Sequence, residues 1–286
     1  MNRQQPTTDF HILNLGAGVQ STALYLLDAD GELKDELGIK FTHAIFADTQ
    51  EEPDSVYEHL EWLESLGGVP ILKGTAGKIG DDLLKEETST KQRFASIPAF
   101  TLSPDGSKGM TRRQCTSEYK IQVVERVIRR DIIGLEPRKR IPKDVTFIQY
   151  MGFSFDEPGR AARAKGRFEQ RGWNVAFPLF EMQWKRFDCA EYLKGRVPHH
   201  VPRSACVFCP YKSDREWANL KESDESGWAR AVEIDEGIRK PGVIVNRNLD
   251  GELFLHRSCK PLKDANLGQN QGQLDFMAEC EGGCGL

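Results

Sequence analysis

A glycine-rich turn between the first apolar run and the first helical segment constrains the fold more than any other feature of the chain. Residues 10–15 (FHILNL) predict a buried strand, and the turn of Gly16, Ala17 and Gly18 leads into a helix over about 21–27 (STALYLL). Backbone N–H groups in such a turn, together with the helix N-terminus behind it, favour an anion. The turn therefore predicts a phosphate site, although a tight strand–helix connection would give the same pattern.

Strands and helices go on alternating along the first 185 residues, which predicts an α/β fold with a parallel sheet flanked by helices and right-handed crossovers. We expect further strands at about 41–47, 69–72, 145–151 and 175–179, and helices at about 53–66, 116–131 and 157–170. The polar segment 88–111 predicts a long surface loop.

The chain changes character from about residue 186, where cysteine- and proline-bearing turns separate expected helices at 186–194, 214–221 and 225–239. We therefore expect a nucleotide-binding domain over 1–185 and, over 186–286, a C-terminal helical extension that bears cysteines and packs on the same domain.

Charge is distributed unevenly along the chain. The net charge is −4, yet residues 1–90 hold 6 Lys/Arg against 17 Asp/Glu, and residues 108–171 hold 16 against 8. The basic segment 108–171 predicts a patch for phosphates, tRNA or DNA, with solvated helix faces as the alternative. No apolar run reaches the roughly 20 residues of a membrane span, and the polar N-terminus lacks an export signal, so we expect a cytoplasmic protein without membrane contact.

Cysteines are the strongest chemical feature of the second half. In a cytosolic chain of this size, metal or redox chemistry explains them better than disulfides. Cys206 and Cys209 form a C-x-x-C pair, which by itself fits zinc, an iron–sulfur cluster or a redox dithiol equally well. Cys189 lies on an expected amphipathic helix and is interpreted as an ordinary buried cysteine.

The turn also resembles a known family. LNLGAGVQSTAL is similar to the PP-loop of the ATP pyrophosphatase (adenine nucleotide α-hydrolase) superfamily, usually S-G-G-x-D-S, with Gly16 at the first Ser and Gln20 at the Asp. ADTQEE at 47–52 resembles the D-T-G-x-E turn of the phosphoadenosine phosphosulfate (PAPS) reductase branch. Residues 113–121, 152–160 and 178–188 resemble three later motifs of that branch, in the same order.

This resemblance implies a PP-loop, HUP-like fold that binds ATP or another adenine nucleotide, with Mg²⁺ as a further cofactor. Glu157 would be a catalytic residue that orients the nucleotide, although a helix cap with a surface ion pair is the alternative. The nucleotide-binding residues it implies are Leu15, Gly16, Ala17, Gly18, Gln20, Ser21, Thr22, Asp48, Thr49 and Arg160.

A cluster is implied by the same resemblance. Cys115 lies about as far before the C-x-x-C pair as in [4Fe-4S] sulfonucleotide reductases, which implies three cluster ligands. The fourth position is open: Cys284 is the candidate we name, Cys280 and Cys259 are alternatives, and an iron without a protein ligand could bind sulfide. A four-cysteine zinc site is the alternative. Cys280 stands where PAPS reductases carry a nucleophilic cysteine in an E-C-G-I-H tail, here ECEGGCGL, and is the second expected catalytic residue.

Three functions remain open at this stage. The first is ATP-dependent activation and sulfur transfer to a nucleotide or nucleic-acid acceptor, with a sulfur or electron donor protein as partner. The second is reduction of a sulfonucleotide with release of sulfite. The third is a non-catalytic nucleotide- or nucleic-acid-binding module with structural zinc.

Overall fold

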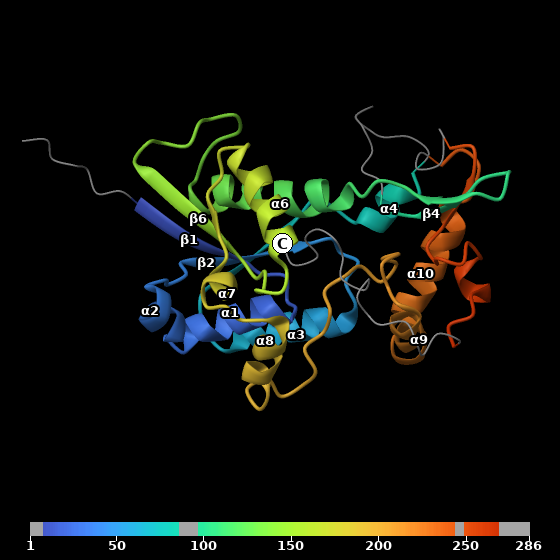
Figure 1. The fold of residues 1–286 in the computed structure, drawn as a ribbon. Coiled ribbons are helices and arrows are strands. Elements are labelled where there is room, and N and C mark those ends of the chain that lie inside the picture. Colours follow the sequence, from blue (N-terminus) through green and yellow to red (C-terminus); the bar gives the residue numbers. More distant parts are fainter. Residues whose placement is uncertain (1–7, 86–96, 244–248, 269–286) are drawn as a thin grey trace, which may run out of the picture.

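The computed structural model describes residues 8–85, 97–243 and 249–268, and a five-stranded parallel sheet organises them (Figure 1). The strand order is β3-β2-β1-β6-β7, and the strands are β1 (Thr8–Asn14), β2 (His43–Asp48), β3 (Ile71–Thr75), β6 (Val145–Met151) and β7 (Val175–Ala176). The predicted α/β class is thereby confirmed. Strand order reverses direction between β1 and β6, and open sheets bind ligands at such a switch point, beyond the carboxyl ends of the strands.

Helices cover both faces of the sheet. One face carries α1 (Val19–Ala29), α2 (Glu32–Leu37), α3 (Asp54–Ser65) and α8 (Arg186–Leu193), whose buried side chains form a core with Leu13 and Phe46. The other face carries α5 (Gln122–Val127) and α6 (Pro158–Glu169), which pack on Ile12 and Ile45. Figure 1 shows the two layers above and below the sheet.

A third core lies beyond the carboxyl edge of the sheet. It is built by α4 (Ile79–Leu83), α9 (Asp214–Ser223) and α10 (Glu225–Gly237) around the fully buried Trp217. Helix α8, by contrast, buries Cys189 and Leu193 in the core of the sheet. Cys189 is the ordinary buried cysteine that we expected.

The expected long loop at 88–111 is wrong over its second half. There, β4 (Phe100–Leu102) and β5 (Lys108–Met110) form an antiparallel hairpin, and β8 (Glu252–Phe254) adds a third strand by pairing with β4. Three-residue strands of this kind have too little alternation to be recognised, and the partner that stabilises β4 lies about 150 residues away.

Two further boundaries differ from expectation for local reasons. The strand expected at 175–179 ends at Ala176, because Pro178 begins the short helix α7 (Pro178–Glu181) at a position where proline needs no N–H partner. Strand β3 runs to Thr75 and passes through Gly74, where a Cβ would lie 2.6 Å from Val127 Cγ2. Glycine there lets α5 pack closely on the sheet.

The segment between residues 116 and 132 is helical, as predicted, but irregular. It consists of η1 (Thr116–Ile121), α5 and η2 (Ile128–Ile132), of which η1 and η2 are π-helical turns. Such turns are frequent at functional sites. No helix in the described ranges is long and apolar enough to span a membrane.

Candidate functional site

The glycine-rich turn between β1 and α1, named the phosphate turn after its predicted ligand, is held together by Ser21. Ser21 Oγ accepts hydrogen bonds of 3.2 Å from the N–H groups of both Gly16 and Gly18 and donates to the Gly18 carbonyl. Ala17 has a φ of 54°, in the left-handed region that residues other than glycine seldom adopt. Such backbone is retained where surrounding structure over-determines it, often at ligand sites. Because the N–H groups of Gly16 and Gly18 are taken up by Ser21, the donors left for an anion are those of the first turn of α1.

Thr22 was expected in the phosphate site, but the structure places its hydroxyl in the core. Thr22 Oγ1 lies 2.8 Å from His59 Nε2, and both residues are fully buried. His59 Nδ1 lies in turn 2.8 Å from His199 Nε2. Burial, reinforced by His199, lowers the pKa of His59 to about 4. Thr22 therefore anchors α1 to α3, and Ser21 is the hydroxyl that organises the turn.

Gln20 and Glu157 join the phosphate turn to the end of β6. The Gln20 amide donates to Glu157 Oε2 over 3.1 Å, and the same oxygen accepts from the N–H and hydroxyl of Ser154. Arg160 forms an ion pair with Glu157 Oε1, and Arg186 donates to the side-chain amide oxygen Oε1 of Gln20 over 3.4 Å. Both Glu157 oxygens are thus engaged, and its expected catalytic role stays a prediction.

The same contacts give a physical reason for glutamine at position 20. An acidic side chain there would bring a second carboxylate against the buried Glu157, whereas an amide donates to it. Close packing completes the joint, since a Cβ on Gly152 would lie only 3.0 Å from the Ser21 nitrogen.

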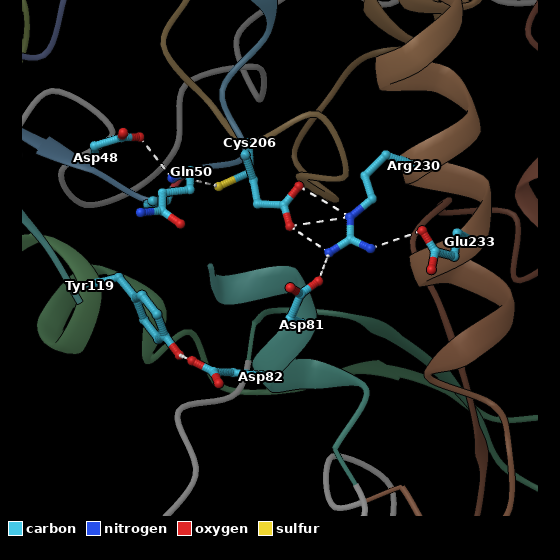
Figure 2. A network of polar contacts seen from close by, with 10 residues as sticks. Asp48, Gln50, Asp81, Asp82, Tyr119, Cys206, Arg230 and Glu233 are labelled. Atoms are coloured by element: carbon cyan, nitrogen blue, oxygen red, sulfur yellow. Dashed lines mark hydrogen bonds and ion pairs between the residues drawn. The ribbon is translucent and has the colours of Figure 1, made fainter. Parts of the chain in front are cut away.

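The turn after β2 holds the cysteine-bearing loop in place. Asp48 accepts from the Gln50 N–H at 2.7 Å and from the Tyr57 hydroxyl at 3.0 Å, which fixes the turn. Thr49 Oγ1 then lies 3.2 Å from Cys206 Sγ, and the Val207 N–H donates to the carbonyl of Glu51. Figure 2 shows Cys206 next to the turn that bears Asp48 and Gln50. Asp48 and Thr49, expected beside the nucleotide, thus link the sheet to the C-x-x-C pair.

One arginine fastens the third core to this edge. Arg230 of α10 makes hydrogen bonds to the buried carboxylate of Glu51, at 2.7 Å for the closest, and ion pairs with Asp81 and Glu233 (Figure 2). Gly80 leaves room for the ion pairs around Arg230, because a Cβ at position 80 would lie 2.2 Å from Glu51 Oε1. Sequence analysis missed Glu51 and Arg230, and no local pattern relates residues 179 positions apart.

Three predicted cluster ligands line one pocket. Cys115 immediately precedes η1, and the turn from Cys206 to Cys209 is closed by a 2.9 Å bond from the Cys209 N–H to the Cys206 carbonyl. All three cysteines line the pocket, together with Arg113, Lys120 and Tyr211. Burial and the nearby Glu52 raise the pKa of the Cys206 thiol, while Lys120 and the Thr49 hydroxyl act in the opposite direction.

A cluster and a single zinc ion place different demands on cysteine ligands. Within the described ranges, no three ligand-type side chains converge closely enough to hold a single ion. Zinc requires such convergence, because each sulfur must lie about 2.3 Å from the same atom. In an iron–sulfur cluster each thiolate binds a different iron, so the ligands stand further apart. Cys115, Cys206 and Cys209 line one pocket, as either arrangement requires.

Other cysteines divide between the core and the undescribed terminus. Cys259 is buried beside the hairpin, with its sulfur 3.8 Å from the Thr101 carbonyl oxygen, and Cys189 lies in the core of the sheet. Cys280 and Cys284, the expected nucleophile and fourth ligand, lie outside the described residues.

The phosphate turn and the cysteine pocket are connected by one short segment. Residues 202–209 begin at the turn, where the Pro202 carbonyl oxygen is 4.0 Å from the place of a Cβ on Gly18, and end at the C-x-x-C pair. The phosphate turn and the cysteine pocket therefore both lie at the carboxyl edge of the sheet, where open α/β folds bind their ligands.

Comparison with known proteins adds little to this geometry. No family model and no curated protein matches the chain. Among solved structures, the U34-tRNA thiolase NcsA from Methanococcus maripaludis, determined with its [4Fe-4S] cluster, aligns with 14% identity and a TM-score of 0.34. The alignment covers 96% of this chain and 85% of the thiolase. A likeness of that size assigns neither family nor activity.

Proposed function

We propose that the protein activates an acceptor with ATP and then transfers sulfur to it, using a [4Fe-4S] cluster. The observation that supports this proposal is that the glycine-rich turn after β1 and a pocket lined by three cysteines lie at one edge of the sheet, joined by residues 202–209. The proposed acceptor is a nucleotide or nucleic acid with an oxygen that sulfur can replace.

In the first step, the N-terminus of α1 binds the ATP phosphates. An oxygen of the acceptor attacks the α-phosphorus, and pyrophosphate leaves. The acceptor oxygen is then part of an adenylate and has become a good leaving group. Ser21 and the Gln20–Glu157 pair hold the turn in position during this displacement.

In the second step, inorganic sulfide displaces AMP, which departs with the former acceptor oxygen, so sulfur replaces oxygen without net oxidation or reduction. Cys115, Cys206 and Cys209 would hold the cluster, with Cys284 as the proposed fourth ligand. The cluster would supply the place at which sulfide is delivered. Arg113 and Lys120 add positive charge to the pocket, which favours an anion.

Metal content and pyrophosphate release test the proposal together. Protein purified without oxygen should contain about four irons and four sulfides per chain, with absorption near 400 nm that Cys206→Ser abolishes and Cys189→Ser retains. ATP and acceptor should then yield pyrophosphate and a thiolated product. One zinc and no iron would contradict the proposal and favour the binding module. Sulfite released from a sulfonucleotide without ATP would instead assign the reductase activity.

A further inference from the structure

Arginines surround an open hollow on the outer side of α5 and η2. The hollow lies next to Ala76, just past the end of β3, and the loop at 135–138 borders it. Its five arginines are Arg126, Arg129, Arg130, Arg138 and Arg171. Three glutamates also line the hollow, so five positive side chains face three negative ones and its net charge is positive. Tyr119 is a further lining residue.

Five arginines outnumber the three glutamates of the hollow, so its side chains carry a net positive charge. Arg126 donates to the carbonyl of Thr75 and Arg129 to the carbonyl of Lys139, contacts that position the side chains without neutralising them. Arg171 forms an ion pair with Glu125 at 2.6 Å and is the one arginine of the hollow that does so within the described ranges. Arg130 and Arg138 are exposed. The hollow is thus a cationic surface on which Arg126, Arg129 and Arg171 are held in place by their contacts.

We propose that this hollow binds the phosphodiester backbone of a nucleic-acid acceptor. Guanidinium groups present planar forks of donors that match phosphate oxygens. Surrounding charge directs such a ligand here, because the chain as a whole carries −4 and residues 1–90 alone carry 11 more acidic than basic groups. A polyanion is therefore repelled by much of the molecule and attracted by this surface.

The hollow lies close to the cysteine pocket, and the functional interpretation of this closeness rests on the proposed function. Glu118, Tyr119 and Gln122 line the hollow, whereas Cys115, Thr116 and Lys120 line the cysteine pocket, so η1 stands between them. The two surfaces are about one helix diameter apart, roughly 10 Å. A strand docked on the arginines would have a neighbouring nucleotide within reach of the sulfur-transfer site.

Charge reversal at the two exposed arginines tests the proposal on the full chain. Fluorescence anisotropy would measure the Kd of Arg130→Glu/Arg138→Glu for a labelled single-stranded 20-nucleotide RNA and for the DNA of the same sequence. Loss of two phosphate contacts should weaken binding by about tenfold or more and reduce the loss of affinity between 50 and 200 mM salt by about seven- to tenfold. The two oligonucleotides identify which backbone is preferred.

A matched control separates a local effect from net charge. Lys34→Glu/Lys260→Glu makes the same change in charge at two exposed residues away from the hollow. Equal weakening by both double variants, or unchanged binding by the arginine variant, would overturn the proposal. Loss of binding to a polyglutamate peptide with nucleic-acid binding unchanged would overturn it in favour of an acidic protein.

Failure of this proposal can be distinguished from failure of the proposed function. Neither arginine touches the phosphate turn or the cysteine pocket, so ATP affinity and iron content should be the same in the arginine variant and in the wild type. Weakened nucleic-acid binding without pyrophosphate release in any variant would support the hollow and contradict the enzyme. Suppose instead that the arginine variant binds nucleic acid as the wild type does and releases pyrophosphate equally well with a small nucleotide as acceptor. That result would support the enzyme and contradict the hollow.

Discussion

Replacing Gln20 by glutamate probes the joint between the phosphate turn and the end of β6. The substitution preserves shape but puts a carboxylate oxygen where an amide donates to Glu157 over 3.1 Å. Two such charges about 4 Å apart repel by about 4 kcal/mol at an effective dielectric constant near 20. Arg186, which is exposed, offsets about 1 kcal/mol of this. We therefore expect Gln20→Glu to lower the free energy of unfolding by about 3 kcal/mol at pH 8.

The loss should depend on pH with a definite sign. Repulsion raises the pKa of one carboxyl of the pair above its unfolded value of about 4.3, so the native state takes up a proton more readily than the unfolded state. The destabilisation is complete above the raised pKa and shrinks as the pH falls. A penalty of 3 kcal/mol corresponds to a shift of about 2 pKa units, which leaves about 1 kcal/mol at pH 5.

Urea unfolding at pH 8 and pH 5 measures both values, each relative to the wild type at the same pH. Gln170→Glu, at an exposed helix end, should change stability by less than about 0.5 kcal/mol at either pH. Gln20→Glu combined with Glu157→Gln restores one amide and one carboxylate, so the double-mutant cycle should show about 2 kcal/mol of favourable coupling. A penalty that is equal at both pH values, or no coupling, would refute the reasoning.

Three other perturbations have clear expected outcomes. Arg230→Met should cost about 3–5 kcal/mol by leaving the Glu51 carboxylate buried without its partner, as thermal unfolding would show; a loss below 1 kcal/mol would contradict this. Burial lowers the pKa of His59 to about 4, so the unfolded state takes up a proton first as the pH falls, and the free energy of unfolding should drop by about 2 kcal/mol between pH values above 6.5 and pH 5. Urea titration of His59→Gln should lack that drop, and a variant with the same pH dependence as the wild type would disprove the reasoning. Gly152→Ala places a Cβ 3.0 Å from the Ser21 nitrogen and should weaken ATP binding in calorimetry, whereas Gly166→Ala, which meets nothing within 4 Å, should not.

Local patterns in the sequence were enough to predict the parallel sheet and the glycine-rich turn between β1 and α1, whereas phosphate binding by that turn stays a prediction. Apolar runs define β1, β2 and β6, and glycines between β1 and α1 mark the turn, because each feature is encoded within about ten residues. The gathering of Cys115 with Cys206 and Cys209 around one pocket also agrees with the spacing from which a shared site was inferred. Cluster binding itself stays a prediction, as do the roles of Cys280 and Cys284.

Contacts between distant segments could not be predicted in this way. The direction of the Thr22 hydroxyl depends on His59, the role of Glu157 depends on Gln20, and the strand pairing of β4 depends on β8. In each case a short side chain or strand has several equivalent local choices, and a partner far along the chain selects one. Such selection leaves no periodicity that a single sequence can reveal.

The attachment of Arg230 to Glu51 bears on how the molecule can be dissected. A fragment that ended before α9 would retain Glu51 as a buried carboxylate without its guanidinium and would expose Ile79 and Leu83, which now pack in the third core. Neither half is therefore an independent module. Truncations and fusions made to assign the phosphate turn and the cysteine pocket to separate parts would measure misfolding, so only point substitutions in the whole chain can divide their roles.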